Sequence, residues 1–189
     1  FKATWIVFQS ITWLGKKRPT TFYQNHILNL DLSQIQGCFN ANKLCICKKV
    51  PNVYSTVFYT ILKQFVKYPF VLSNIGVSDC EILDARSKGR FTSREPEPRA
   101  NVKSGHIPAS KNLPYTDVLD GNKFKQEEEL KAIFEILNPH RKPMIFTCGS
   151  GITACVLALA AKISGHQDGV VYDGSWTEWG SIQNLPIEV

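Results

Sequence analysis

The fold follows from residues 147–155, which read Thr147-Cys148-Gly149-Ser150-Gly151-Ile152-Thr153-Ala154-Cys155. The apolar run 143–147 at the start of this stretch predicts a buried strand. The alanine- and leucine-rich run 154–164 predicts a helix that ends at Gly165. Cys148 is therefore expected where a strand gives way to a tight loop and then to a helix.

The residues around Cys148 make it a candidate nucleophile. Gly149 and Gly151 allow the backbone to turn sharply and to aim several N–H groups inward, and the helix adds the positive end of its dipole. An anion is favoured at such a position, and the thiolate is the nucleophilic form of cysteine. The alternative is a buried, inert cysteine beside an ordinary turn. The combination of glycines, hydroxyl groups and a helix start favours the nucleophile.

The composition is that of a globular protein with a modest positive charge. The 189 residues suffice for one domain with a long arm, or for one domain and a fragment of a second. Lys and Arg exceed Asp and Glu by 22 − 16 = 6, which suits a small anionic substrate or a soluble surface. We expect neither nucleic-acid binding nor membrane insertion, because the basic runs are short and no apolar run approaches the roughly 20 residues that span a bilayer.

The cysteine spacing points to reduced thiols. The six cysteines are Cys38, Cys45, Cys47, Cys80, Cys148 and Cys155, and they match neither a disulfide framework nor a paired zinc site. The cluster at 38–47 has no histidine or second cysteine pair nearby at ligand spacing. We therefore expect an intracellular protein, cytoplasmic or mitochondrial, with no metal and no cofactor.

Strands and helices alternate over residues 80–180. Apolar runs predict strands at 81–85 and 169–172 in addition to 143–147, and residues 127–137 carry apolar side chains at helical spacing. This order predicts an α/β domain with a mostly parallel central sheet flanked by helices. Ligands of such sheets bind beyond the carboxyl ends of the strands, so the proline-rich loop 90–99 is expected beside Cys148.

Five motifs carry a resemblance to a known family. They are 84–91 (Asp-Ala-Arg-Ser-Lys-Gly-Arg-Phe), 95–99 (Glu-Pro-Glu-Pro-Arg), 105–108 (Gly-His-Ile-Pro), 148–154 (Cys-Gly-Ser-Gly-Ile-Thr-Ala) and 172–179 (Tyr-Asp-Gly-Ser-Trp-Thr-Glu-Trp). In this order they resemble the catalytic half of the 3-mercaptopyruvate sulfurtransferases, which belong to the rhodanese superfamily. The resemblance covers roughly residues 68–189.

The resemblance implies a domain organisation. Members of the family are tandems of two rhodanese domains, and only the second bears the active cysteine. Residues 71–189 are thus interpreted as a catalytic rhodanese-like domain, and residues 1–70 as a truncated or divergent remnant of the first domain. A segment of this length forms at most a partial domain or an arm.

The resemblance also implies a reaction. Arg90 and Arg99 would hold the carboxylate and carbonyl end of 3-mercaptopyruvate, a task that suits the guanidinium fork. The thiolate of Cys148 would take the substrate sulfur as a persulfide and release pyruvate. Thioredoxin, a small thiol or cyanide would then accept the sulfur.

The loop around the cysteine would serve both binding and catalysis. Gly149, Gly151 and Ile152 are expected to line the substrate position. Ser150 and Thr153 are expected to donate hydrogen bonds during catalysis, with loop capping as the alternative role of each hydroxyl.

Several alternatives remain open. Thiosulfate is a second sulfur donor, although thiosulfate-preferring relatives carry basic residues directly after the cysteine, where this chain has Gly149 and Ser150. Phosphate-ester cleavage is disfavoured because Ala154 stands where related phosphatases have an arginine. The chain could instead be a non-catalytic module that carries a persulfide or binds a partner. Arg90 and Arg99 could also be surface ion-pair partners of nearby glutamates.

Other polar and aromatic residues are interpreted as structural. His106 lies in a packing turn, Asp84 and Asp173 organise loops at strand ends, and Cys155 packs within the helix. Trp176 and Trp179 are expected to close the core.

Overall fold

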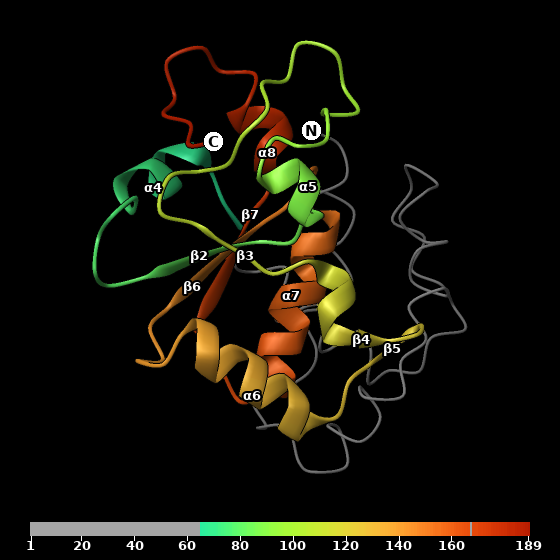
Figure 1. Ribbon diagram of the computed structural model, residues 1–189. Helices are drawn as coiled ribbons and strands as arrows, with labels where there is room; N and C mark the ends of the chain where they lie inside the picture. The colour runs from blue at the N-terminus through green and yellow to red at the C-terminus, as the bar shows by residue number, and fades with distance from the viewer. Residues whose placement is uncertain (1–64, 167) are drawn as a thin grey trace, which may run out of the picture.

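Five parallel strands form the central sheet of the structure, a computed structural model that describes residues 65–166 and 168–189 (Figure 1). Across the sheet the strands are β1 (Phe65–Val66), β7 (Gly169–Tyr172), β6 (Met144–Thr147), β2 (Glu81–Asp84) and β3 (Lys111–Asn112). Every neighbouring pair runs parallel. The predicted parallel α/β architecture is confirmed.

The helices connect these strands. They are α4 (Tyr68–Ser73), α5 (Lys88–Phe91), the 3-10 helix η2 (Tyr115–Val118), α6 (Glu127–Leu137), α7 (Ile152–Ile163) and α8 (Ser175–Trp179). A short antiparallel hairpin, β4 (Leu119–Asp120) and β5 (Lys123–Phe124), follows η2.

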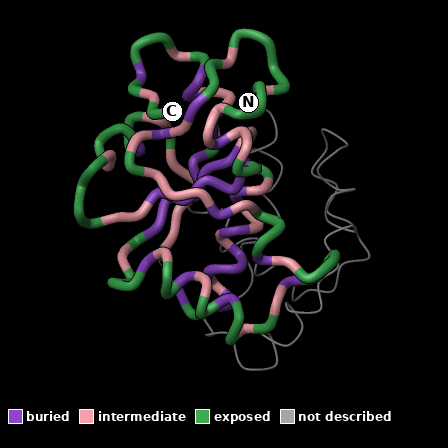
Figure 2. Tube along the Cα trace, in the orientation of Figure 1, coloured by how far each residue is buried: buried purple, intermediate pink, exposed green. Residues whose placement is uncertain are grey.

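Alternation along the strands divides the core into two layers. Leu83 and Phe146 face one side of the sheet and belong to the cluster that contains the buried residues of α6 and α7. Ile82 and Ile145, their neighbours along the strands, face the other side and pack with the buried residues of α4 and α8. Figure 2 shows the resulting buried strands at the centre of the domain. The sheet is thus covered on both faces, as a parallel sheet requires.

Helix α6 has the bounds that its sequence predicts. Leu130 and Phe134, one turn apart, are fully buried, and the other face of the helix is exposed. Gln126 and Glu129 form a capping box at its start, where three glutamates also complement the helix dipole.

Helix α7 begins two residues earlier than predicted. Gly151 precedes it with a φ of 88°, a left-handed conformation that glycine adopts without strain. This turn lets the helix start at Ile152, directly after the cysteine loop. Its alanines and leucines are largely buried, and the chain leaves the helix before Gly165.

The domain division stays a prediction. Strand β1 pairs with β7 although it precedes residue 71, and α4 runs across the 70/71 boundary. The rest of the predicted remnant, including the cysteines at 38–47, lies outside the described residues.

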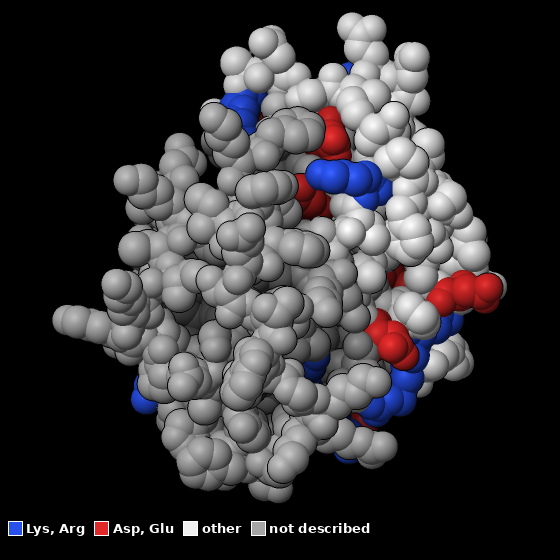
Figure 3. Space-filling model, turned by 180° about the vertical axis from the view of Figure 1, so that it is seen from behind, with Lys and Arg blue, Asp and Glu red and all other residues white. Residues whose placement is uncertain are grey.

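Charged side chains of opposite sign are mixed on the face that Figure 3 draws. Where Figure 3 draws described residues, basic and acidic side chains lie next to one another. Among the described residues, no helix is long and apolar enough to cross a membrane.

Candidate active site

Cys148 follows the carboxyl end of β6 and is almost fully buried, with 1% of its surface exposed. The N–H of Gly151 donates a hydrogen bond of 3.1 Å to its Sγ. That amide immediately precedes α7, so its positive charge adds to the dipole of a twelve-residue helix. The sulfur therefore lies against a backbone donor at the start of a helix.

Helix α8 fixes the peptide planes of the cysteine loop. The N–H of Trp176 donates to the carbonyl of Cys148 and the N–H of Thr177 to the carbonyl of Gly149, both at 2.9 Å. In a trans peptide the carbonyl and the following N–H point in opposite directions. The N–H groups of Gly149 and Ser150 are therefore turned away from α8, and neither has an acceptor within the described part of the chain. These two amides, like that of Gly151, are thus backbone donors of the cysteine loop, a type of group that suits an anion.

Ser175 lies beside Cys148, although the sequence analysis did not select it as a site residue. Its Oγ accepts a hydrogen bond of 3.1 Å from the N–H of Cys148 and lies 3.9 Å from the Cys148 Sγ. Ser175 has a φ of 48°, and its Oγ also donates to the carbonyl of Tyr172. The sequence signal was present, because Ser175 follows β7 at the same edge of the sheet as Cys148.

Arg90 lies against the cysteine loop. It belongs to α5 rather than to the proline-rich loop, and a Cβ added to Gly149 would stand 3.1 Å from its Nη2. Glycine at 149 thus allows the guanidinium to pack directly on the loop backbone. The predicted proximity of the 90–99 segment and Cys148 is observed at this point.

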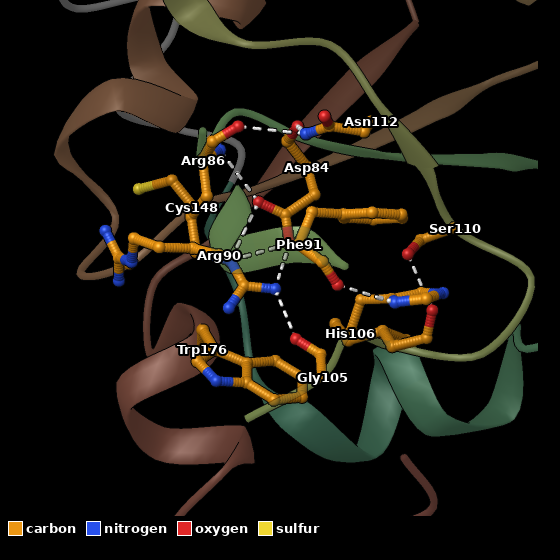
Figure 4. A network of polar contacts seen from close by, with 12 residues as sticks. Asp84, Arg86, Arg90, Phe91, Gly105, His106, Ser110, Asn112, Cys148 and Trp176 are labelled. Atoms are coloured by element: carbon orange, nitrogen blue, oxygen red, sulfur yellow. Dashed lines mark hydrogen bonds and ion pairs between the residues drawn. The ribbon is translucent and has the colours of Figure 1, made fainter. Parts of the chain in front are cut away.

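Glu97 holds Arg90 in that position. Its carboxylate forms ion pairs of 2.6 Å with Arg90 and 2.8 Å with Arg86, and its side chain is only 5% exposed. The fully buried Arg86 also pairs with Asp84 and stacks on Trp176, with the guanidinium carbon 4.4 Å from the ring centroid. Figure 4 shows part of this network beside Cys148. The ion-pair alternative for Arg90 is therefore observed, and it occurs beside the cysteine loop.

Arg99 is linked to the cysteine loop indirectly, through the hydroxyl group of Thr177. Its Nη1 donates to the Oγ1 of Thr177 at 2.6 Å, and the same Oγ1 donates to the carbonyl of Gly149 at 2.6 Å. Unlike Arg90, Arg99 is exposed. Both arginines predicted for substrate binding thus lie at the cysteine loop.

The remaining predicted site residues lie at the start of α7. Ser150 and Ile152 are exposed and Thr153 is half-buried. Within the residues that the structure describes, neither the Ser150 nor the Thr153 hydroxyl has a hydrogen-bond partner. They stay candidates for contact with a bound substrate.

Cys155 is chemically distinct from Cys148. Burial raises the pKa of its thiol to about 12, and the neighbouring Cys148 adds to the shift. Its Sγ donates to the carbonyl of Gly151 at 3.3 Å. Cys155 is thus a protonated packing residue at neutral pH, as its place in the helix predicts.

His106 has a structural role. Its ring stacks on Phe91 at 3.9 Å, and Nδ1 lies 2.9 Å from the Phe91 carbonyl oxygen. Its backbone exchanges hydrogen bonds with Glu188, which ties the C-terminal tail to the domain. Over residues 65–166 and 168–189, no group of three or more His, Cys, Asp or Glu side chains is placed to hold a metal ion.

Gly151→Ala is expected to disrupt the sulfur contact. A Cβ at this position would lie 2.8 Å from the backbone oxygen of Asp173, and alanine strains a positive φ by about 1–3 kcal/mol. We expect the rate of Cys148 alkylation by iodoacetamide to fall about tenfold. Gly121→Ala is the matched control, since Gly121 has a φ of 59° with open space around it. Equal alkylation rates in the two variants would contradict the role of the Gly151 amide.

Comparison with known proteins identifies the domain family of the chain. Residues 71–182 match the family model described as rhodanese-like domain. The chain is 43% identical over 119 residues to 3-mercaptopyruvate sulfurtransferase of Mus musculus, covering 61% of this chain and 40% of that protein. It is 46% identical to thiosulfate/3-mercaptopyruvate sulfurtransferase 1, mitochondrial, of Arabidopsis thaliana, over 56% of this chain and 28% of that protein. Thiosulfate sulfurtransferase of Bos taurus is 44% identical, over 64% and 42%. The chain thus spans less than half the length of these relatives.

Two solved structures share the fold of this domain. The yeast mitochondrial complex I sub-stoichiometric sulfur transferase subunit superposes with a TM-score of 0.59 at 38% identity, over 67% of this chain and 45% of that one. Tum1 from Saccharomyces cerevisiae superposes with a TM-score of 0.56 at 32% identity, over 62% and 43%.

Proposed function

The chain belongs to the rhodanese-like domain family, and we propose that it is a sulfurtransferase whose nucleophile is Cys148. The observation that carries the proposal is the hydrogen bond from the Gly151 N–H to the Cys148 Sγ at the start of α7. It supports a stabilised thiolate at the carboxyl end of a central strand, where parallel sheets bind ligands.

The proposed sulfur donor is 3-mercaptopyruvate. Arg90 and Arg99 both reach the cysteine loop, and their guanidinium groups suit a carboxylate and an adjacent carbonyl. Glu97 engages Nε and Nη2 of Arg90, so Nη1 is the Arg90 donor assigned to substrate. Thiosulfate is the second candidate donor, because the bovine relative bears that name.

The reaction follows from the nucleophile and the donor. The Cys148 thiolate attacks the sulfur of 3-mercaptopyruvate, an S–S bond forms, and the C–S bond breaks. The electron pair of that bond leaves with the enolate of pyruvate, which takes up a proton on carbon. The N–H groups of the cysteine loop stabilise the persulfide anion on Cys148, and Ser150 and Thr153 supply hydroxyl donors.

A second nucleophile completes the cycle. Attack on the outer sulfur by thioredoxin, a small thiol or cyanide transfers it and restores the Cys148 thiolate. This chemistry requires reduced thiols, and the three cysteines in the described part of the chain are free. We therefore place the protein inside the cell, in the cytoplasm or a mitochondrion.

Arg90→Ala and Arg99→Ala test the choice of donor. Loss of a charge-assisted contact costs about 2–4 kcal/mol, so each variant should raise the KM for 3-mercaptopyruvate and leave kcat less affected. The measurement is steady-state pyruvate release, with thiosulfate as the competing donor.

Arg94→Ala is the matched control, since it removes an exposed arginine from the same segment. Unchanged kinetics for 3-mercaptopyruvate in both test variants would contradict the proposed donor site. A higher kcat/KM for thiosulfate in the wild-type chain would favour the second candidate.

A further inference from the structure

Thr177 connects two parts of the site that are far apart in the sequence. Its Oγ1 accepts from the Arg99 Nη1 and donates to the Gly149 carbonyl, each at 2.6 Å. The Thr177 N–H donates to the same carbonyl at 2.9 Å. One residue of α8 thus joins the proline-rich segment to the residue after Cys148.

The hydroxyl has a defined orientation in this arrangement. A threonine hydroxyl has one hydrogen, which goes to the Gly149 carbonyl, and its lone pair faces the Arg99 cation. Each of these hydrogen bonds polarises the other. Since Arg99 is exposed and has several rotatable bonds, this contact decides where its guanidinium rests.

We propose that Thr177 is a positioning residue that holds Arg99 against the cysteine loop and so sets the affinity of the site for carboxylate-bearing sulfur donors. This inference rests on the proposed function, in which Arg99 binds the carboxylate. Only one Arg99 N–H is used by Thr177, and a guanidinium has five, so donors remain for a substrate.

Two substitutions separate the hydroxyl from the rest of the residue. Thr177→Val keeps the branched shape and the N–H that binds the Gly149 carbonyl, so that carbonyl retains a partner and α8 stays in place. Thr177→Ser restores the hydroxyl without the methyl group. If Thr177 had only a structural role, its substitution would change the reaction of Cys148 with charged and with neutral reagents to the same extent.

The experiment compares two alkylating reagents on the full chain. Iodoacetate and iodoacetamide both form a bond between carbon and the Cys148 sulfur and release iodide, but only iodoacetate carries a carboxylate. The ratio of their rates, followed by mass spectrometry of the Cys148 peptide, cancels the intrinsic reactivity of the thiolate. It therefore reports carboxylate binding without requiring sulfur transfer.

Thr177→Val should lower the iodoacetate-to-iodoacetamide ratio about tenfold, which corresponds to the loss of one oriented ionic contact. In Thr177→Ser the ratio should stay within about twofold of the wild-type value. The KM for 3-mercaptopyruvate should rise in Thr177→Val and change little in Thr177→Ser. An unchanged ratio in Thr177→Val would overturn the inference. So would an equal fall in both rates, because Thr177 would then act on the thiolate instead of on Arg99.

The outcome also separates the two proposals. If wild-type protein forms no persulfide from 3-mercaptopyruvate, the proposed function fails, whereas the rate ratio still tests Thr177. If persulfide forms and the ratio is insensitive to Thr177→Val, only the present inference fails.

Discussion

Cys148→Ser is expected to abolish sulfur transfer. A serine hydroxyl in place of the thiol cannot form the persulfide, and the loop donors around Gly151 then have no sulfur anion to stabilise. The measurement is pyruvate release from 3-mercaptopyruvate together with thiocyanate formed from cyanide, both of which should fall to the uncatalysed rate.

Cys80→Ser is the matched control for that variant. Cys80 immediately precedes β2, at the amino end of the strand and hence at the opposite edge of the sheet from Cys148. Its thiol lies 3.7 Å from the Asn74 carbonyl and has no place in the proposed chemistry. A Cys148→Ser protein as active as Cys80→Ser would disprove the assigned nucleophile.

Arg86→Met is expected to cause the largest loss of stability. The Arg86 and Asp84 side chains are fully buried, and Arg86 also pairs with Glu97 and donates to the Gly105 carbonyl. Removing the guanidinium leaves the Asp84 carboxylate buried without its cation. Breaking a buried pair in this way lowers the free energy of unfolding by about 3–5 kcal/mol, measured by urea denaturation.

Two further variants make the stability measurement specific. Lys67→Met breaks an ion pair of the same length with Asp173, but those side chains are 66% and 56% exposed, so the loss should be under about 1 kcal/mol. Arg86→Lys keeps the charge but loses the planar guanidinium fork, so its loss of stability should lie between those of Lys67→Met and Arg86→Met. If Arg86→Met were no less stable than Lys67→Met, the buried network would not hold the domain together.

Local patterns predicted β2, β6 and β7 and the two longest described helices, but not the shorter helices or the outer strands of the central sheet. The apolar spacing of residues 127–137 gave α6 with its observed bounds, because a one-sided apolar face has a single way to be buried. The strand before Cys148 and the helix after it were likewise predictable, since a short apolar run and an alanine-rich run differ in length and composition. The first turn of α7 was missed because Ile152 and Thr153 have weak helix propensity and depend on the Gly151 turn.

The site was predictable only in part. Cys148, Arg90 and Arg99 lie in recognisable sequence motifs, and the structure places Arg90 against the cysteine loop and links Arg99 to it through the Thr177 hydroxyl. The contacts of Ser175 and Thr177 with the cysteine loop were missed because their partners lie far away in the sequence, and α8 comes beside that loop only when β7 pairs with β6.

Glu97 illustrates a further limit of the sequence. An ion pair with Arg90 was one of two alternatives, and the substrate site was the other. The ion pair is observed, because the carboxylate engages Nε and Nη2 of Arg90, and the same guanidinium lies against Gly149. Whether one side chain meets both a carboxylate and a loop depends on its direction, which residue spacing in the sequence does not determine.

The most direct test of the account is the intact mass of the wild-type chain before and after incubation with 3-mercaptopyruvate, with pyruvate measured in the same sample. We predict a gain of one sulfur atom per chain, mapped to Cys148 by peptide analysis and matched by an equal amount of pyruvate. A folded chain that gains no sulfur, or that carries it on another cysteine, would contradict the assignment of Cys148 as the sulfur-accepting nucleophile.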